Sequence, residues 1–249
     1  MAKSSGVLKI EGTIEDLTFY KKDGKFLVRK KGGISKERIE NDPSFIRTRE
    51  NGSEFGHSGK AGKILRLALG NMVYKAKDNK LSSRMLQVMS QIKNHDLTSV
   101  RGERKVGLGL TTAEGKQLLK GFDFNNNAAL KSVFFAPYEL DTATGVITIA
   151  NFTPVEQLQF PQGSTHVSFQ GAVLAIDFAT EVSEVAYSNI ENLAIDMTVS
   201  NRVLTPTSVP TGTGIQLFLV MISFYQEVNG VQYSLKNEEY NVLHVLEVV

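Results

Sequence analysis

The chain has 249 residues, of which 41% are hydrophobic and 22% charged, and it contains no cysteine. This composition is typical of a globular protein that is long enough to bury a core, and it excludes disulfide bonds and thiolate metal ligands. The net charge of +2 conceals an uneven distribution: 25 basic and 13 acidic residues precede residue 122, whereas 3 basic and 13 acidic residues follow. Such asymmetry favours a basic module that meets a polyanion, or two regions that attract each other between subunits.

Residues 1–33 predict a β-hairpin arm. Residues 7–10 and 17–20 are rich in β-forming side chains, and Asp23-Gly24 predicts a tight turn before a returning strand at residues 26–29. Two or three short strands are marginal alone, so we expect the arm to pack against something else, most favourably another subunit. Its lysines either protect the strand edges or contact a polyanion.

Residues 34–124 predict a basic, mostly helical segment. Apolar residues recur at helical spacing over residues 63–76 and again after residue 83. We expect these helices to pack on one another or on the C-terminal region. The start and stop signals are Asp42 with Pro43, Asn79, Ser82 or Ser83, and the capping-box pattern Thr111-Thr112-Ala113-Glu114.

Residues 125–249 predict an antiparallel β-sandwich, which makes the whole chain α+β. Asn229-Gly230 predicts a type I′ hairpin, because both residues readily take positive φ. Near Gly171 the apolar pattern changes phase, which indicates a bulge or a bend. The expected strands cover residues 131–136, 146–150, 165–180, 185–188, 192–200, 215–227, 231–235 and 242–249.

No catalytic constellation is present in the sequence, so we expect no enzymatic activity, no cofactor and no metal. The histidines (His57, His95, His166, His244) are scattered without paired ligand spacing. Four glycines at residues 52, 56, 59 and 62 do not match a phosphate-binding loop. Their spacing favours a small-residue side of a helix or a flexible joint.

The basic residues are the remaining functional signal. They could contact phosphates in a sequence-independent way, although aromatic residues among them are few and no nucleic-acid-reading module is recognisable. The candidate nucleic-acid-binding residues are Lys30, Lys31, Arg47, Arg49, Lys60, Lys63 and Arg66.

No apolar run approaches the ~20 residues that span a bilayer. The first residues also lack the apolar core of a signal peptide. We therefore expect a soluble protein made in the cytoplasm without a signal peptide or a membrane span. The final location, whether cytoplasm, virion or extracellular assembly, is left open.

Several motifs resemble a family of uncharacterised Bacteroidota proteins. They are GTIEDLTFY at residues 12–20, NDP at 41–43, RTREN at 47–51, EFG at 54–56, FYQEVNG at 224–230 and YN at 240–241. The N-terminal pattern of Gly, strand, Gly-Lys and a strand ending in Arg is similar to small proteins encoded near phage-type structural genes. The resemblance implies no established site residues.

The leading functional hypothesis is a structural, self-assembling subunit of a particle, filament or phage-like assembly, which forms a homo-oligomer through its N-terminal arm. One alternative is a nucleic-acid-binding protein that uses the basic residues above. A second alternative, a sandwich that binds glycans or surface ligands, rests on fold analogy alone.

Overall fold

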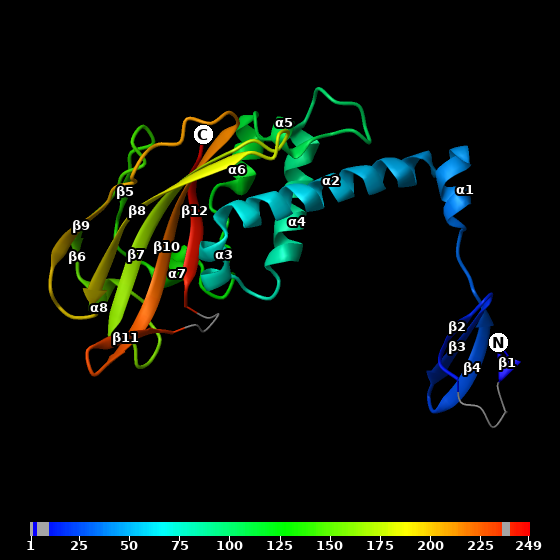
Figure 1. Ribbon diagram of the computed structural model, residues 1–249, viewed down its shortest axis with the longest axis horizontal. Coiled ribbons are helices and arrows are strands. Elements are labelled where there is room, and N and C mark those ends of the chain that lie inside the picture. Colours follow the sequence, from blue (N-terminus) through cyan, green and yellow to red (C-terminus); the bar gives the residue numbers. More distant parts are fainter. Residues whose placement is uncertain (1, 4–9, 236–239) are drawn as a thin grey trace. The chain divides into compact units, whose positions relative to one another are not determined.

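The computed structural model describes residues 2–3, 10–235 and 240–249 (Figure 1). Its contacts divide the chain into two units, Met1–Arg49 and Glu50–Val249. The predicted strand at residues 7–10 lies outside the described residues except for its last position. The predicted domain boundaries after residues 33 and 124 stay predictions.

The first unit contains a small antiparallel sheet with the strand order β1-β4-β3-β2. The strands are β1 (Ala2–Lys3), β2 (Gly12–Ile14), β3 (Leu17–Lys22) and β4 (Lys25–Lys30). Asp23 and Gly24 join β3 to β4 with φ values of 51° and 74°, so the predicted tight hairpin is confirmed.

Helical structure follows this sheet. The Asp42 side chain accepts a hydrogen bond from the Ser44 N–H, which confirms the predicted cap before Pro43. The helices of the chain are α1 (Lys36–Asn41), the 3-10 helix η1 (Pro43–Phe45), α2 (Ile46–Leu69), α3 (Asn71–Ala76), α4 (Leu81–Ile92), the 3-10 helix η2 (Lys93–His95), α5 (Val106–Gly109), α6 (Ala113–Leu119), α7 (Leu130–Val133) and α8 (Pro154–Gln157).

The second unit is built on a five-stranded antiparallel sheet. β10 pairs with β7 on one side and with β11 and β12 on the other, and β8 follows β7. A separate three-stranded sheet has the order β5-β6-β9. The strands are β5 (Glu139–Leu140), β6 (Ile147–Phe152), β7 (His166–Ile176), β8 (Ser183–Ala194), β9 (Ser200–Leu204), β10 (Ile215–Val228), β11 (Val231–Ser234) and β12 (Val242–Val248).

Two hydrophobic cores lie on opposite faces of the five-stranded sheet. Helices α2 to α6 cover one face, and the three-stranded sheet covers the other (Figure 1). Strand β10 alternates between them: Leu217 and Leu219 belong to the helix-side core, whereas Phe218 and Val220 belong to the other. Both faces of this part of β10 are therefore buried, as its continuous apolar sequence predicts.

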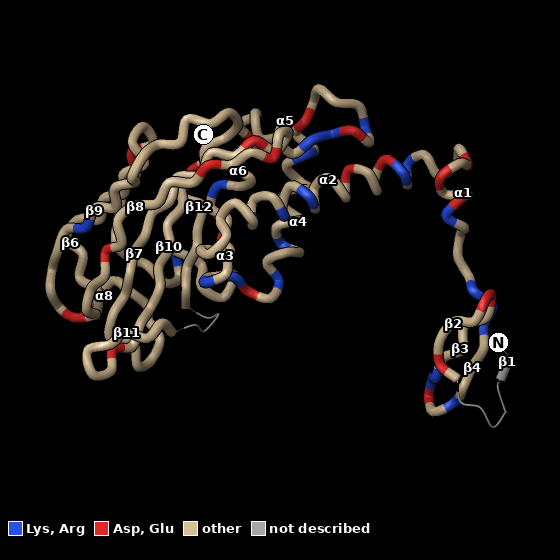
Figure 2. The backbone as a smooth tube through the Cα atoms, in the orientation of Figure 1, with Lys and Arg blue, Asp and Glu red and all other residues tan. Residues whose placement is uncertain are grey.

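The predicted combination of helices and antiparallel sheets is confirmed, and the finer assignment of a β-sandwich stays a prediction. Most Lys and Arg residues lie on the helices and loops, whereas the central strands carry few (Figure 2). Among the described residues, no helix is long and apolar enough to cross a membrane.

Three predicted helix boundaries are wrong. The expected helix at residues 63–76 is part of α2 and then α3, because the chain breaks at Gly70, whose φ is 43°. Helix α4 begins at Leu81 rather than after a serine cap. Just before the helix, the Asp78 side chain accepts a hydrogen bond from the Lys80 N–H. At α6, Thr112 rather than Thr111 is the capping residue, since it accepts from the Gly115 N–H.

Two predicted strands are also wrong. Within residues 131–136 the chain forms α7, because the Asp123 side chain accepts the Leu130 N–H and starts a helical turn there. The strand expected at residues 192–200 ends at Ala194. The Asp196 side chain then accepts the Thr198 N–H and turns the chain toward β9.

The irregularity predicted near Gly171 exists, but it lies in the neighbouring strand. Gln170 pairs with Ile190 and Ala172 with Tyr187, so β8 carries one extra residue opposite Gly171. Strand β7 itself keeps its alternation. Its apolar pattern changes because the helix-side core contains Ala172, Leu174 and Ile176 but no earlier β7 residue.

Candidate functional site

The N-terminal sheet has two different faces, which its register defines. Paired residues of antiparallel strands point to the same side. Phe19 pairs with Val28, Lys21 with Phe26, and Ile14 with Leu17. The apolar face is the side that carries Ile14, Leu17, Phe19, Phe26 and Val28, and Lys21 and Lys30 lie on the same side.

The opposite face is mixed, because it carries the Tyr20–Leu27 pair beside polar residues. Thr18 pairs with Arg29 there, and the Arg29 guanidinium lies 5.4 Å from the centre of the Tyr20 ring. Thr13 and Thr18 face each other with their hydroxyl oxygens 3.3 Å apart. This face therefore has more polar and cation–π contacts than the apolar face, although Leu27 also lies on it.

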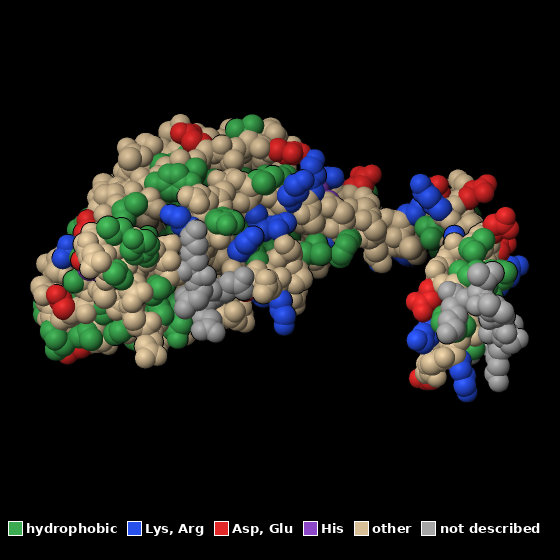
Figure 3. Space-filling view, turned by 60° about the horizontal axis from the view of Figure 1, so that its bottom comes forward, with side chains coloured by type: hydrophobic (Ala, Val, Ile, Leu, Met, Phe, Trp, Pro, Cys, Tyr) green, Lys and Arg blue, Asp and Glu red, His purple; other side chains and the backbone are tan. Residues whose placement is uncertain are grey.

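No residue from 10 to 49 is buried, so the apolar face has no layer packed on it within this range. Ile14 is 53% exposed and Leu17 is 45% exposed. Hydrophobic side chains of this unit reach the surface beside Lys and Arg side chains (Figure 3). Covering apolar side chains of this kind with another surface is favourable.

The seven predicted nucleic-acid-binding residues fall in both units. Lys30, Lys31, Arg47 and Arg49 belong to the first, and Lys60, Lys63 and Arg66 to the second. Several use their charged groups within the chain. Arg49 donates to the Ile39 and Asp42 carbonyls, Lys60 pairs with Glu181, and Arg66 donates to the Ser82 hydroxyl. The structure leaves nucleic-acid binding as a prediction.

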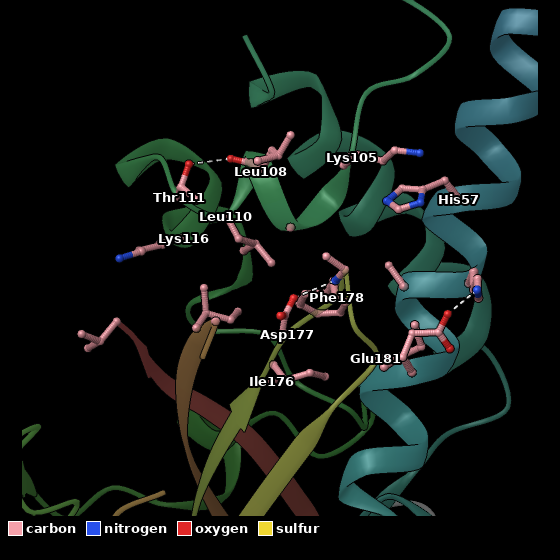
Figure 4. Close-up of a pocket in the computed structure, with 18 residues that line it drawn as sticks. His57, Lys105, Leu108, Leu110, Thr111, Lys116, Ile176, Asp177, Phe178 and Glu181 are labelled. Atoms are coloured by element: carbon pink, nitrogen blue, oxygen red, sulfur yellow. Dashed lines mark hydrogen bonds and ion pairs between the residues drawn. The ribbon is translucent and has the colours of Figure 1, made fainter. Parts of the chain in front are cut away.

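The second unit contains a pocket of about 770 Å³, lined by α2, by the segment from Lys105 to Lys116, and by the turn between β7 and β8 (Figure 4). Its inner wall is apolar and includes Leu110, Ile176 and Phe178, which are buried. Its volume lies within the range of ~300–1,000 Å³ that is usual for small-molecule sites.

His57 lies at the α2 side of this pocket and is held by the backbone. Its Nε2 accepts the Val106 N–H at 3.0 Å. Burial lowers the pKa of His57, and the positive charges of Lys105 and Lys60 lower the pKa further. Because Nε2 accepts this N–H, that ring nitrogen carries no proton in this arrangement.

The acidic residues of the pocket are already engaged. Asp177 accepts from the Ala179 N–H and from the hydroxyls of Thr180 and Thr213, and these hydrogen bonds lower its pKa. Glu181 pairs with Lys60. In contrast, the side chains of Lys105 and Lys116 have no ion-pair or hydrogen-bond partner among the described residues.

Glu181 has an unusual backbone, with φ at 62°. An equivalent turn occurs at residues 141–146: Asp141 accepts from the Ala143 N–H and the Thr144 hydroxyl, just as Asp177 accepts from Ala179 and Thr180. In that turn the matching position is Gly145, with φ at 73°. A glutamate therefore occupies a position that suits glycine, at a cost of roughly 1 kcal/mol.

A buried ionic cluster supports the wall of the pocket. The Glu54 carboxylate on α2 accepts from both Nε and Nη2 of Arg104, at 2.7 and 2.8 Å, from the Gly102 N–H, and from Lys93. The Arg104 hydrogen bonds lower the pKa of Glu54 to about 2, against the opposing effect of its burial. This cluster fixes residues 102–104, which lead directly into the pocket segment.

The other histidines do not join this site. His244 hydrogen-bonds to Asp123 at 2.6 Å, and His166 lies 3.5 Å from Glu227. Within the described part of the chain, no group of three or more His, Cys, Asp or Glu side chains could hold a metal ion.

Comparisons with protein-family models, with curated proteins and with solved structures gave no match.

Sequence reasoning missed the pocket. Its residues come from α2, from residues 105–116, from the β7–β8 turn and from the start of β10, which are far apart in the chain. The one local signal was the pair of Asp-x-Ala-Thr turns at residues 141 and 177. The two turns differ at the next position, which is Gly145 in the first turn and Glu181 in the turn at the pocket.

Proposed function

We propose that this protein is a non-enzymatic structural subunit that assembles with further copies of itself through the apolar face of its N-terminal sheet. The observation that carries the proposal is that this face contains five large apolar side chains, none of them buried. A particle, filament or phage-like assembly is the setting in which such a face becomes covered.

Charge supports another copy of this chain as the partner. Residues 1–49 contain 12 basic and 7 acidic residues, a net charge of +5, whereas residues 50–249 contain 16 and 19, a net charge of −3. Attraction between unlike units of two copies favours a head-to-tail contact. Such contacts repeat and build rings or filaments.

Two neighbouring substitutions on opposite faces test the proposal. We expect Phe19→Glu to reduce the mass measured by light scattering to that of a monomer, because it places a charge on the apolar face. Thr18→Glu changes the opposite face and should leave the assembly intact. Equal masses for both variants would contradict the assignment of the face.

The assembly of the unmodified chain has to be measured before that of the variants. Charge attraction is least screened at low salt, so assembly should be evident at ~50 mM salt and high micromolar concentration. Deleting residues 1–32 should abolish assembly and leave the rest folded. A monomeric intact chain under these conditions would contradict the proposal.

Nucleic-acid binding and glycan binding stay predictions. The first requires binding that weakens steeply as salt rises, since each phosphate contact releases counterions. The second would appear as a signal on a glycan array.

A further inference from the structure

The pocket of the second unit has a definite chemical character. Its interior is apolar, with Leu110, Ile176 and Phe178 on the wall, so it favours a ligand with an apolar body. Its lining includes lysines from different elements: Lys60 from α2, Lys105 before α5, and Lys116 from α6. The Lys116 side chain points away from the cavity (Figure 4).

The side chains that line the pocket include three lysines and two carboxylates, so their formal charge is positive and favours an anionic ligand. Asp177 and Glu181 are occupied by hydrogen bonds and by Lys60, respectively. Lys105 and Lys116 add two positive charges that no described side chain neutralises. Lys60 and Lys105 line the pocket together with His57.

The strained turn is a second and independent observation. The matching turn at residues 141–146 uses Gly145 where this one uses Glu181, although a glycine would fit the backbone better. Glu181 is exposed and its carboxylate touches Lys60 at the pocket. Unfavourable backbone conformations of this kind concentrate at binding sites.

We propose that this pocket binds an organic anion with an apolar body, whose acid group lies beside Lys105 and Lys60. The apolar part fills the space against Leu110 and Phe178. Glu181 competes with the acid group for Lys60 and so limits the affinity. This site is separate from the assembly surface of the N-terminal sheet.

Titration calorimetry of the full chain with decanoate tests the proposal. We expect saturable binding, and weaker binding of decyltrimethylammonium, which has the same chain and the opposite charge. Lys105→Gln should weaken decanoate binding about fivefold, as expected for loss of one partly exposed ion pair. Glu181→Gln should tighten it about twofold, because Lys60 is released. Lys131→Gln, at an exposed lysine of α7 outside the pocket, is the control and should change nothing.

A pair of blocking substitutions tests the location. Ala179→Trp fills the pocket, whereas Ala143→Trp makes the same change in the equivalent turn away from it. We expect the first to abolish decanoate binding and the second to preserve it. The proposal is overturned if decanoate does not saturate, if the cation binds equally well, if Glu181→Gln weakens binding, or if both tryptophan variants behave alike.

Discussion

Glu54 and Asp96 are the two buried carboxylates that hold the loop after η2, and Glu54 alone forms ion pairs there. Its side chain is only 2% exposed, and it compensates the charges of Lys93 and Arg104 while accepting the Gly102 N–H. A buried carboxylate is tolerated only when its hydrogen-bonding capacity is filled, and here four donors fill it. The cluster therefore couples α2 to residues that lie about 50 positions later in the chain.

Replacing Glu54 should be costly. We expect Glu54→Gln to lower the free energy of unfolding by about 3 kcal/mol, because two cations lose their partner in a buried site. Urea denaturation measures this difference. Glu184→Gln, at an exposed position of β8, should change stability by less than about 0.5 kcal/mol. Similar losses for both would contradict a special role for Glu54.

The same residue predicts a dependence on pH. Its folded-state pKa is lowered from 4.5 to about 2, so the ionised form is the stabilising one. Its contribution is complete above pH 4.5 and disappears as the pH falls toward 2, for a total of about 3 kcal/mol. Denaturation at pH 6, 4 and 3 should show this loss. The loss should be smaller in Glu54→Gln, which has no carboxylate to protonate.

At the scale of elements, local signals were predictable and long-range ones were not. Asn229-Gly230 and Asp23-Gly24 determine their turns by themselves, since both residues of each pair take positive φ. Helix α7 could not be predicted because the Asp123 carboxylate that starts it lies outside the helix. The glycine spacing on α2 left two options open, a small-residue side of a helix or a flexible joint. At Gly62 the first holds: α4 approaches so closely that a Cβ there would lie 2.9 Å from the Met85 side chain.

The two Asp-x-Ala-Thr turns provide a prediction about elements. We expect Gly145→Ala to destabilise by about 2 kcal/mol, because φ is positive and the new Cβ would lie 2.5 Å from a Val173 methyl group. Glu181→Gly should change stability by less than about 1 kcal/mol, since relief of backbone strain offsets the lost ion pair. Thermal unfolding compares them. A larger loss at Glu181 would show that its ion pair, rather than its position in the turn, is decisive.

At the scale of the whole molecule, both hydrophobic cores belong to the second unit. A fragment of residues 50–249 should therefore unfold with a midpoint close to that of the main transition of the intact chain. A fragment of residues 125–249 should be insoluble, because it lacks the helices that cover Leu174, Leu217 and Leu219. Calorimetry and sedimentation test this pair. A soluble, cooperatively folded second fragment would contradict the need for the helix layer.

The position of β12 also bears on how the protein is made. This strand pairs with β10 and supplies Val242 and Leu246 to one core and Leu243, Val245 and Val248 to the other. Until residue 248 has emerged from the ribosome, neither core can be completed, although helices α2 to α6 emerge well before it. The N-terminal hairpin needs only adjacent residues and can form early. Nascent chains stalled before residue 242 should therefore be sensitive to protease and bind chaperones throughout the second unit.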